Sequence, residues 1–218
     1  MPLITSIKQQ RNKDRVNVYL DDKFGFGIDL DNFVLLHLKV DQELTEKEVE
    51  EIVKKAEFQK TLDKLLRFAM VRPRSGKEVR DYFTRKRVPP FLHLELLKKL
   101  KHLELLDDEK FAKWWIDQRV QFKNKSKRVI QMELRQKGID KNIIDDAFGE
   151  TVIDEGKMAR ELLEKKAYKW KKLEPRLARQ KMSQYLAGKG FSWDVITNLC
   201  KFDMSSSSND AIEKVTSK

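Results

Sequence analysis

The stretch from residue 106 to residue 139 reads LDDEKFAKWWIDQRVQFKNKSKRVIQMELRQKGI, and it decides the fold of this chain. Asp107 and Asp108 stand where the N-cap of a helix is expected, and apolar residues at helical spacing follow them. A basic polar link and a second amphipathic helix come next, and Gly138 marks a helix stop. The stretch therefore predicts two helices joined by a short link.

Weaker copies of this pattern lie on both sides of it. A shift of 51 residues aligns Phe83 with Leu134, and a further shift of 52 residues reaches Leu186. The helix stop at Gly138 recurs at Gly190. The other aligned positions are Val79, Ile130 and Met182; Lys86, Lys137 and Lys189; Val88, Ile139 and Phe191; and Leu92, Ile143 and Val195. Core positions and helix stops thus recur together, which is typical of tandem helical repeats.

We predict a mainly α-helical chain of tandem three-helix repeats, in an elongated array that can curve, with a small N-terminal β-hairpin region. Residues 1–57 form the hairpin and helix region. The three repeats occupy residues 58–106, 107–150 and 151–202. The tail, residues 203–218, contains four consecutive serines and is expected to be disordered.

Alternation of apolar residues with polar residues or glycine characterises the N-terminal region. Residues 16–20, VNVYL, and 24–28, FGFGI, flank the turn Asp21-Asp22-Lys23 and predict a β-hairpin. An isolated hairpin is marginal, so it needs residues 3–8 as a further strand or a helix to pack on. Gly25 and Gly27 are flat packing positions, since no helix N-terminus follows to make a nucleotide loop.

Capping boxes and prolines set the predicted helices before the organising stretch. A short apolar helix is expected over residues 31–39. Thr45-x-x-Glu48 is a capping box that starts a long helix, expected to reach residue 71 with a break near Glu57. Ser75-x-x-Glu78 starts the next helix, and prolines after residue 88 stop it.

Positive charge is concentrated in the middle of the chain. The 218 residues contain 46 Lys and Arg against 35 Asp and Glu, a net charge of +11. Residues 1–57 carry −3, residues 58–148 carry +10 and residues 149–218 carry +4. This distribution points to an anionic partner, either a nucleic acid or an acidic protein face. A merely solvated surface is the alternative on charge alone.

Several functional classes are disfavoured by the sequence. Cys200 is the only cysteine, so no intrachain disulfide can form and a cytoplasmic location is expected. No apolar run approaches the ~18 residues that span a bilayer, so we expect no membrane association. His37, His93 and His102 lack metal-ligand spacing, and no phosphate-binding glycine motif is present. We therefore expect no enzyme activity, no metal and no cofactor, and a monomer.

The polar faces of the predicted second helices differ between the copies. The corresponding positions are Lys77, Arg80 and Thr84 in the first copy, Arg128, Gln131 and Arg135 in the second, and Gln180, Ser183 and Ala187 in the third. A basic stripe therefore fades along the array, which solubility alone does not explain. With the links, whose cations lie near helix N-termini that favour anions, the candidate binding residues are Arg72, Arg74, Lys77, Arg80, Lys123, Lys125, Lys127, Arg128 and Arg135.

Three other interpretations of the middle region are disfavoured by its sequence. Phe111, Trp114, Trp115 and Phe122 alternate with lysines, as in single-strand binding surfaces, but their helical spacing favours core positions, with one tryptophan as the exception. The paired Asp107-Asp108 is explained by N-capping without catalysis. A helix-turn-helix reader of DNA sequence is disfavoured because the third helix of the second copy is acidic.

Three motifs carry a family resemblance, in order along the chain. They are RPRSGKEV at residues 72–79, LDDEKFA at 106–112 and LRQKGID at 134–140. Together they resemble the RecX family of bacterial recombination regulators, and the hairpin segment and Lys189-Gly190-Phe191 are similar to the form found in Gram-positive members. The resemblance covers about residues 1–200.

The resemblance implies a protein that binds filaments of the RecA recombinase on single-stranded DNA. It further implies inhibition of ATP hydrolysis, strand exchange and co-protease action by those filaments, and so modulation of recombination, DNA repair and the SOS response. The alternative is a non-specific helical-repeat protein that competes for single-stranded or duplex DNA through phosphates. A scaffold for an unrelated acidic protein is a third interpretation.

Overall fold

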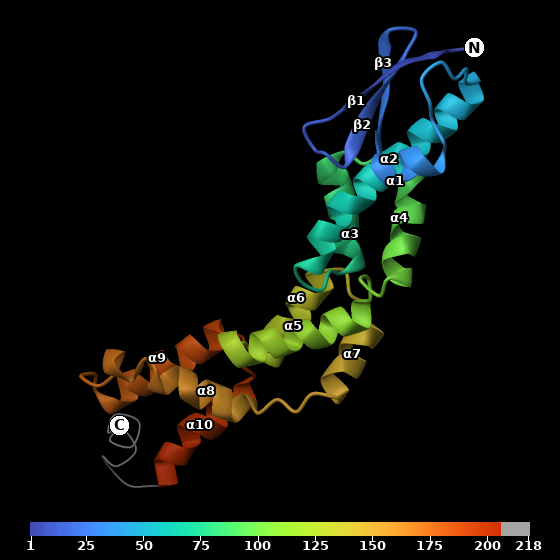
Figure 1. The fold of residues 1–218 in the computed structure, drawn as a ribbon. Helices are drawn as coiled ribbons and strands as arrows, with labels where there is room; N and C mark the ends of the chain where they lie inside the picture. The colour runs from blue at the N-terminus through green and yellow to red at the C-terminus, as the bar shows by residue number, and fades with distance from the viewer. Residues whose placement is uncertain (206–218) are drawn as a thin grey trace. The chain divides into compact units, whose positions relative to one another are not determined.

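A computed structural model describes the backbone of residues 1–205 and their side chains, except those of residues 123 and 200–205. The chain divides into two compact units: residues 1–72 with 82–106, and residues 73–81 with 107 onward. The elements (Figure 1) are β1 (Ile4–Gln9), β2 (Arg15–Leu20), β3 (Lys23–Asp29), α1 (Leu30–Leu35), α2 (Glu46–Met70), α3 (Gly76–Lys86), α4 (Pro90–His102), α5 (Asp108–Lys123), α6 (Lys127–Gln136), α7 (Lys141–Gly149), α8 (Glu155–Glu164), the 3-10 turn η1 (Ala167–Lys169), α9 (Pro175–Gly188) and α10 (Trp193–Ser205).

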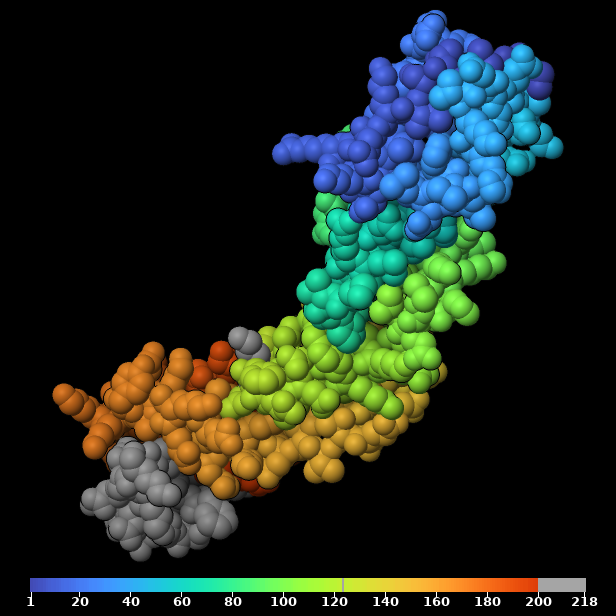
Figure 2. Space-filling view, in the orientation of Figure 1, coloured from blue at the N-terminus to red at the C-terminus, as the bar shows by residue number. Residues whose placement is uncertain are grey.

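The first unit begins with an antiparallel sheet in the order β1-β2-β3. Asp21 and Asp22 take φ values of 48° and 60° in the tight turn between β2 and β3, so the predicted hairpin is confirmed and β1 supplies the further strand it needs. One face of the sheet is buried against α1 and α2 through Val18 and Phe26. In Figure 2 the dark blue sheet lies directly against the lighter blue and cyan helices.

Helix α2 is one continuous helix, so the predicted break near Glu57 is wrong. Its N-terminus has the predicted capping box, in which the Thr45 hydroxyl accepts from the Glu48 N–H at 3.2 Å and Glu48 Oε2 accepts from the Thr45 N–H at 2.7 Å. Ile52 and Ala56 of its first half are buried in the core under the sheet, and Leu65 of its second half is also buried. Because one helix serves both the sheet and the first repeat, it has no need to break between them.

The second unit contains the cores of the second and third copies. Helices α5, α6 and α7 bury Ile116, Leu134 and Ile144 in the second-copy core. Helices α8, α9 and α10 bury Leu163, Leu186 and Ile196 in the third-copy core. Mainly helical three-helix repeats behind a small sheet are therefore confirmed.

The repeat register is confirmed in the second helices and shifts slightly in the third ones. Phe83, Leu134 and Leu186 are 1%, 0% and 0% exposed. In the third helices, however, the buried counterparts of Leu92 in the second and third copies are Ile144 and Ile196. Each lies one position later than the constant shift predicts. The turn before these helices keeps its length, since α4, α7 and α10 begin at Pro90, Lys141 and Trp193, so the helix face that is buried differs slightly, and the neighbours Ile143 and Val195 pack against the core edge instead.

The predicted short helix and the predicted tail have different outcomes. The short helix expected over residues 31–39 ends at Leu35, and His37 takes a φ of 49° two residues later. The predicted tail at residues 203–218 lies outside the described residues, except for its first three positions, which continue α10 to Ser205.

Candidate interaction surface

Helix α6 presents two exposed residues of the predicted binding set. Ile130 and Leu134 are fully buried, which fixes the orientation of the helix in the second-copy core. Arg128 and Arg135 are exposed and lie seven residues apart, which places them two turns apart on one face. In the described part of the chain neither guanidinium forms an ion pair, so both are available to an outside anion.

The corresponding cations of α3 already contact the second copy. The Lys77 ammonium donates to the Gln136 carbonyl oxygen at 2.9 Å. At Gly76, the position that a Cβ would occupy is 3.3 Å from Arg80 Nη1 and 3.6 Å from Asp108 Oδ2, so the Arg80 guanidinium lies over the start of α3 close to that carboxylate. Both residues are exposed, and Lys77 also helps to hold the copies together.

The predicted link residues have several different environments. Lys125 Nζ pairs with Glu133 Oε1 at 2.6 Å, and Lys127 Nζ lies 5.1 Å from the centre of the Phe148 ring. Arg72 and Arg74 are half-buried. The side chain of Lys123 lies outside the described residues. The nine predicted residues therefore do not form one equivalent set.

Glu133 is the centre of a polar cluster on the partly buried face of α6. Its carboxylate accepts from Arg119 Nε at 2.6 Å and from Trp115 Nε1 at 2.9 Å, in addition to Lys125. The Arg119 guanidinium lies 3.9 Å from the Trp115 ring centre. Burial acts to raise the pKa of Glu133, but the hydrogen bonds from Lys125, Arg119 and Trp115 together outweigh it and hold the pKa below its usual value.

The lowered pKa of Glu133 predicts a contribution to acid unfolding. The carboxylate binds a proton more readily in the unfolded chain, so its stabilising effect is complete above the ordinary value of 4.5 and is lost as pH falls below it. We expect Glu133→Gln to be less stable than wild type near neutral pH, with a shallower loss of stability on acidification. Urea unfolding at a series of pH values measures both, with the exposed Glu95→Gln as control. Parallel acid limbs for wild type and Glu133→Gln would contradict this role.

The second helices of successive copies are joined by a repeated set of contacts, which we call the joints. In the first joint, Ser75 Oγ donates to the Lys137 carbonyl oxygen at 2.8 Å and the Gly76 N–H donates to Asp108 Oδ1 at 2.8 Å. Lys137 Nζ also pairs with Glu78 Oε1 at 2.6 Å. Asp107 is the N-cap of α5, as predicted, while Asp108 caps the start of α3 instead.

The second joint reproduces the first between the second and third copies. Ser126 Oγ donates to the Lys189 carbonyl oxygen at 3.1 Å, and the Lys127 N–H donates to Glu155 Oε1 at 2.8 Å. In both joints a carboxylate from the next copy therefore occupies the helix N-terminus that the sequence offered to an outside anion. The basic side chains around it, rather than these backbone amides, remain as anion contacts.

The aromatic residues of α5 are mostly core residues, as expected. Phe111 and Trp115 are 0% and 7% exposed, and Trp114 packs against the edge of the same core. The sequence predicted that one tryptophan would be the exception to core packing. The most exposed of these aromatic rings is instead Phe122, which is 67% exposed at the end of the helix. Val120, two residues earlier, still packs against the core, so Phe122 lies on the outer face of this helix end.

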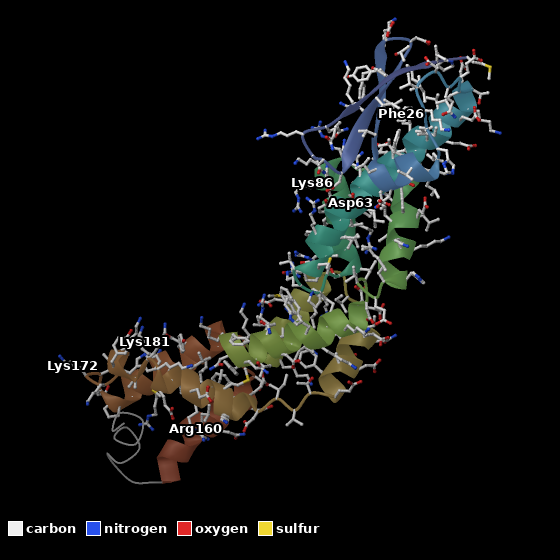
Figure 3. All side chains as sticks on the ribbon, in the orientation of Figure 1. Phe26, Asp63, Lys86, Arg160, Lys172 and Lys181 are labelled. Carbon is white, nitrogen blue, oxygen red and sulfur yellow. The ribbon has the colours of Figure 1, made fainter. Side chains whose placement is uncertain are left out.

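A lysine-rich segment of the third copy was missed by comparing helix faces alone. Residues 165–172, KKAYKWKK, join α8 to α9 through η1, and Tyr168 is 71% exposed among the lysines. Lys172 projects outward at the end of this segment (Figure 3). Because the segment follows the first helix, it lies outside the faces that were compared. Its composition alone would have revealed it.

Among the described residues, no three His, Cys, Asp or Glu side chains converge as metal ligands. No helix in the described range is both long enough and apolar enough to cross a membrane.

Family models match three parts of the chain. Residues 2–45 match the regulatory protein RecX N-terminal domain, residues 107–147 the RecX second three-helix domain, and residues 154–199 the RecX third three-helix domain. These matches coincide with the sheet region and with the cores of the second and third copies.

Whole-chain relatives and solved structures agree with these matches. The chain is 37% identical to regulatory protein RecX of Bacillus licheniformis, over 90% of this chain and 76% of that protein, and 35% identical to its Bacillus subtilis counterpart, over 90% and 75%. A crystal structure of regulatory protein RecX superposes with a TM-score of 0.69 at 27% identity, covering 92% of this chain and 99% of that one. RecX from Lactobacillus salivarius gives 0.58 at 26% identity, covering 74% and 98%.

Proposed function

Because the chain belongs to the RecX family of regulatory proteins, we propose that it binds RecA nucleoprotein filaments and inhibits their ATP hydrolysis, strand exchange and co-protease action. In this role it modulates recombination, DNA repair and the SOS response. We further propose that it acts in the cytoplasm as a monomer and catalyses no reaction itself.

The observation that carries this proposal is the exposed arginine pair of α6. Arg128 and Arg135 are outside the joints and outside the Glu133 cluster, so binding an external anion costs neither of them an internal ion pair. A guanidinium binds carboxylate or phosphate through two parallel hydrogen bonds. The pair can therefore contact either component of a nucleoprotein filament, an acidic protein side chain or a DNA phosphate.

The packing beneath α6 makes this pair a fixed binding element. The buried Ile130 and Leu134 hold the helix in the second-copy core, and the second joint fixes its N-terminus through Ser126 and the Lys127 N–H. Two charges on a preorganised helix lose less freedom on binding than charges on a loop. Lys77 and Arg80 extend the basic surface, with part of their interactions directed to the joint.

Charge reversal tests the proposal. We expect Arg128→Glu/Arg135→Glu to weaken inhibition of RecA-dependent ATP hydrolysis on single-stranded DNA by about ten-fold or more, because it replaces attraction by repulsion at the contact. Adding Arg80→Glu should weaken inhibition further. The assay titrates the protein well below one molecule per RecA, and circular dichroism verifies that helix content is unchanged.

The matched control is Lys55→Glu/Lys98→Glu, which changes net charge equally at exposed positions of α2 and α4. This control should inhibit like wild type. Equal loss in both variants would mean that net charge alone is responsible, and unchanged inhibition by the α6 variant would exclude this surface. Strong inhibition far below one molecule per RecA would indicate blocked filament growth, and inhibition near one per RecA would indicate occupation along the filament.

A second candidate function is non-specific DNA binding, which the lysine-rich segment at residues 165–172 favours. Lysines around an exposed tyrosine suit phosphate contacts combined with base stacking. Such a binder loses affinity steeply between roughly 50 and 200 mM salt and binds bare and RecA-coated DNA equally. Preference for RecA-coated DNA with weak salt dependence would favour the filament instead.

A further inference from the structure

The end of the second helix of the first copy, which lies in the first unit, has the hydrogen-bond acceptor that a joint uses. In the two joints, a serine hydroxyl binds the carbonyl oxygen of Lys137 or Lys189, at the end of the next copy's second helix. The repeat register places Lys86 at this position in the first copy. Among the described residues, no group donates to the Lys86 carbonyl oxygen. The acceptor that a preceding copy would use is thus unpaired.

The residue after this carbonyl also distinguishes the first copy. Gly138 and Gly190 have φ values of 76° and 84°, and a Cβ at either would lie within 2.8 Å of the preceding copy. The first copy has Arg87 there, with a φ of 52°. Among the described residues no helix N-terminus docks against Arg87, and an occupant of this position must leave room for the Arg87 Cβ.

A groove of about 490 Å³ lies beside this helix end, inside the first unit. Strand β3, helix α2 and the end of α3 line it, and Phe26 and Lys86, labelled in Figure 3, belong to its sheet side and its α3 side. Strand β3 is an edge strand of the sheet, and its Phe24, which also lines the groove, is 61% exposed. The sheet thus borders the acceptor surface without filling it.

The groove also contains a carboxylate from the first helix of the first copy. Glu57 lies on α2, as Asp108, which caps the start of α3 in the first joint, lies on α5. Glu57 lines the groove together with Lys86 and Arg87. Its carboxylate forms neither a hydrogen bond nor an ion pair within the described range. Both acceptors of a joint, a carbonyl and a carboxylate, are therefore present and unpaired.

Around these acceptors the groove is strongly basic. Its charged lining residues are Lys60, Lys64, Lys86, Arg87 and Glu57, and the four cations are exposed. None of the four pairs with a carboxylate in the part of the chain that the structure describes. An occupant must therefore supply hydrogen-bond donors for two acceptors and negative charge for their surroundings.

We propose that this groove binds the first turn of an acidic helix of a partner protein, capped by serine or threonine. The cap hydroxyl donates to the Lys86 carbonyl oxygen and an N-terminal amide of the helix donates to the Glu57 carboxylate, the same two kinds of bond as in the joints, with the helix set back far enough to leave room for the Arg87 Cβ. Carboxylates in the first turn meet Lys60, Lys64 and Arg87. Helices commonly carry acidic residues in that turn, so one element satisfies every group.

Other occupants fit less well. The segments of this chain that dock in the joints, residues 72–80 and 123–128, are basic and would be repelled, which disfavours a second copy. A nucleic acid strand would place phosphates beside Glu57 and would offer neither the hydroxyl cap nor the row of amides. The proposed site is separate from the α6 arginine pair and does not depend on the recombinase being the partner.

Fluorescence anisotropy with a labelled helical peptide, SPEELAEALAAK, tests the proposal without recombinase or DNA. We expect saturable binding to the full chain, weakened about ten-fold by Lys60→Glu/Lys64→Glu and weakened when the first serine of the peptide is replaced by alanine. The control Lys98→Glu/Lys101→Glu changes the charge equally on α4 and should bind like wild type. A benzoylphenylalanine at Thr61, which lines the groove, should cross-link to the peptide.

Several results would contradict the proposed binding of an acidic helix. Absence of binding at millimolar peptide, or equal weakening by the α4 control, would overturn the proposal. So would insensitivity to the serine replacement, because the joint geometry would then be irrelevant. Displacement of the peptide by a thymidine oligonucleotide that itself cross-links at position 61 would assign the groove to nucleic acid. Because the assay contains no filament, none of these outcomes depends on the proposed regulatory function.

Discussion

Phe111→Ala is expected to lower the free energy of unfolding by about 3–5 kcal/mol, because it removes a fully buried ring and leaves a cavity in the second-copy core. The Phe111 ring stacks on Trp115 at 5.5 Å between ring centres. Trp115 in turn donates to Glu133, so the loss should also loosen the polar cluster that orients α6. Inhibition of the filament should therefore weaken together with stability.

The matched control lies on the same helix. Phe122 is 67% exposed, and Phe122→Ala should change stability by no more than about 0.5 kcal/mol. Urea unfolding followed by tryptophan fluorescence and by hydrogen exchange in α5 and α6 measures both variants. A large loss for Phe122→Ala, with little for Phe111→Ala, would mean that the helix is rotated relative to the described core.

The sequence could predict the repeat because burial follows periodicity. Phe83, Leu134 and Leu186 recur at fixed distance and occupy the same buried position in each copy, so one helical period identifies the core in all three. The continuous α2 was not predictable in this way. The predicted interruption near Glu57 is absent, because tertiary packing on both the sheet and the first repeat keeps the helix intact.

The candidate binding surface could be predicted only in part. Sequence identifies which lysines and arginines share a face, but it does not reveal where each side chain is already engaged. Lys125 is paired with Glu133 across eight residues, and Lys77 reaches Gln136 across 59. Both contacts depend on packing between helices. Arg128 and Arg135 stand out only after those partners are known.

The joints could not be predicted from local patterns for the same reason. Ser75 was recognised as a helix cap, and its hydroxyl does accept from the Glu78 N–H at 3.2 Å. The same hydroxyl donates to Lys137, 62 residues away. Local sequence supports the first bond and contains nothing about the second. Gly138 and Gly190, which end the second helices, have a comparable double role. Their positive φ can be predicted from the local sequence, but their close approach to the preceding copy cannot.

Gly190→Ala should show that double role as a loss of about 2–5 kcal/mol in the stability of the third copy. About 1–2 kcal/mol comes from placing a side chain at a φ of 84°, and about 1–3 kcal/mol from overpacking. The new Cβ would lie 2.5 Å from Val129 Cγ2 and 2.9 Å from Ser126 Oγ, so it pushes directly on the second joint.

Gly188→Ala separates this effect from the general cost of changing a glycine. Gly188 is the last residue of α9, two positions earlier, and nothing lies within 4 Å of the Cβ it would gain. That variant should be unchanged or more stable by up to about 1 kcal/mol, because alanine favours the helix. Hydrogen exchange should show faster opening of the Lys127 amide in Gly190→Ala alone, since its bond to Glu155 depends on the joint. Equal behaviour of the two variants would mean that the joint adjusts freely to an added methyl group and that α6 is not held rigid by it.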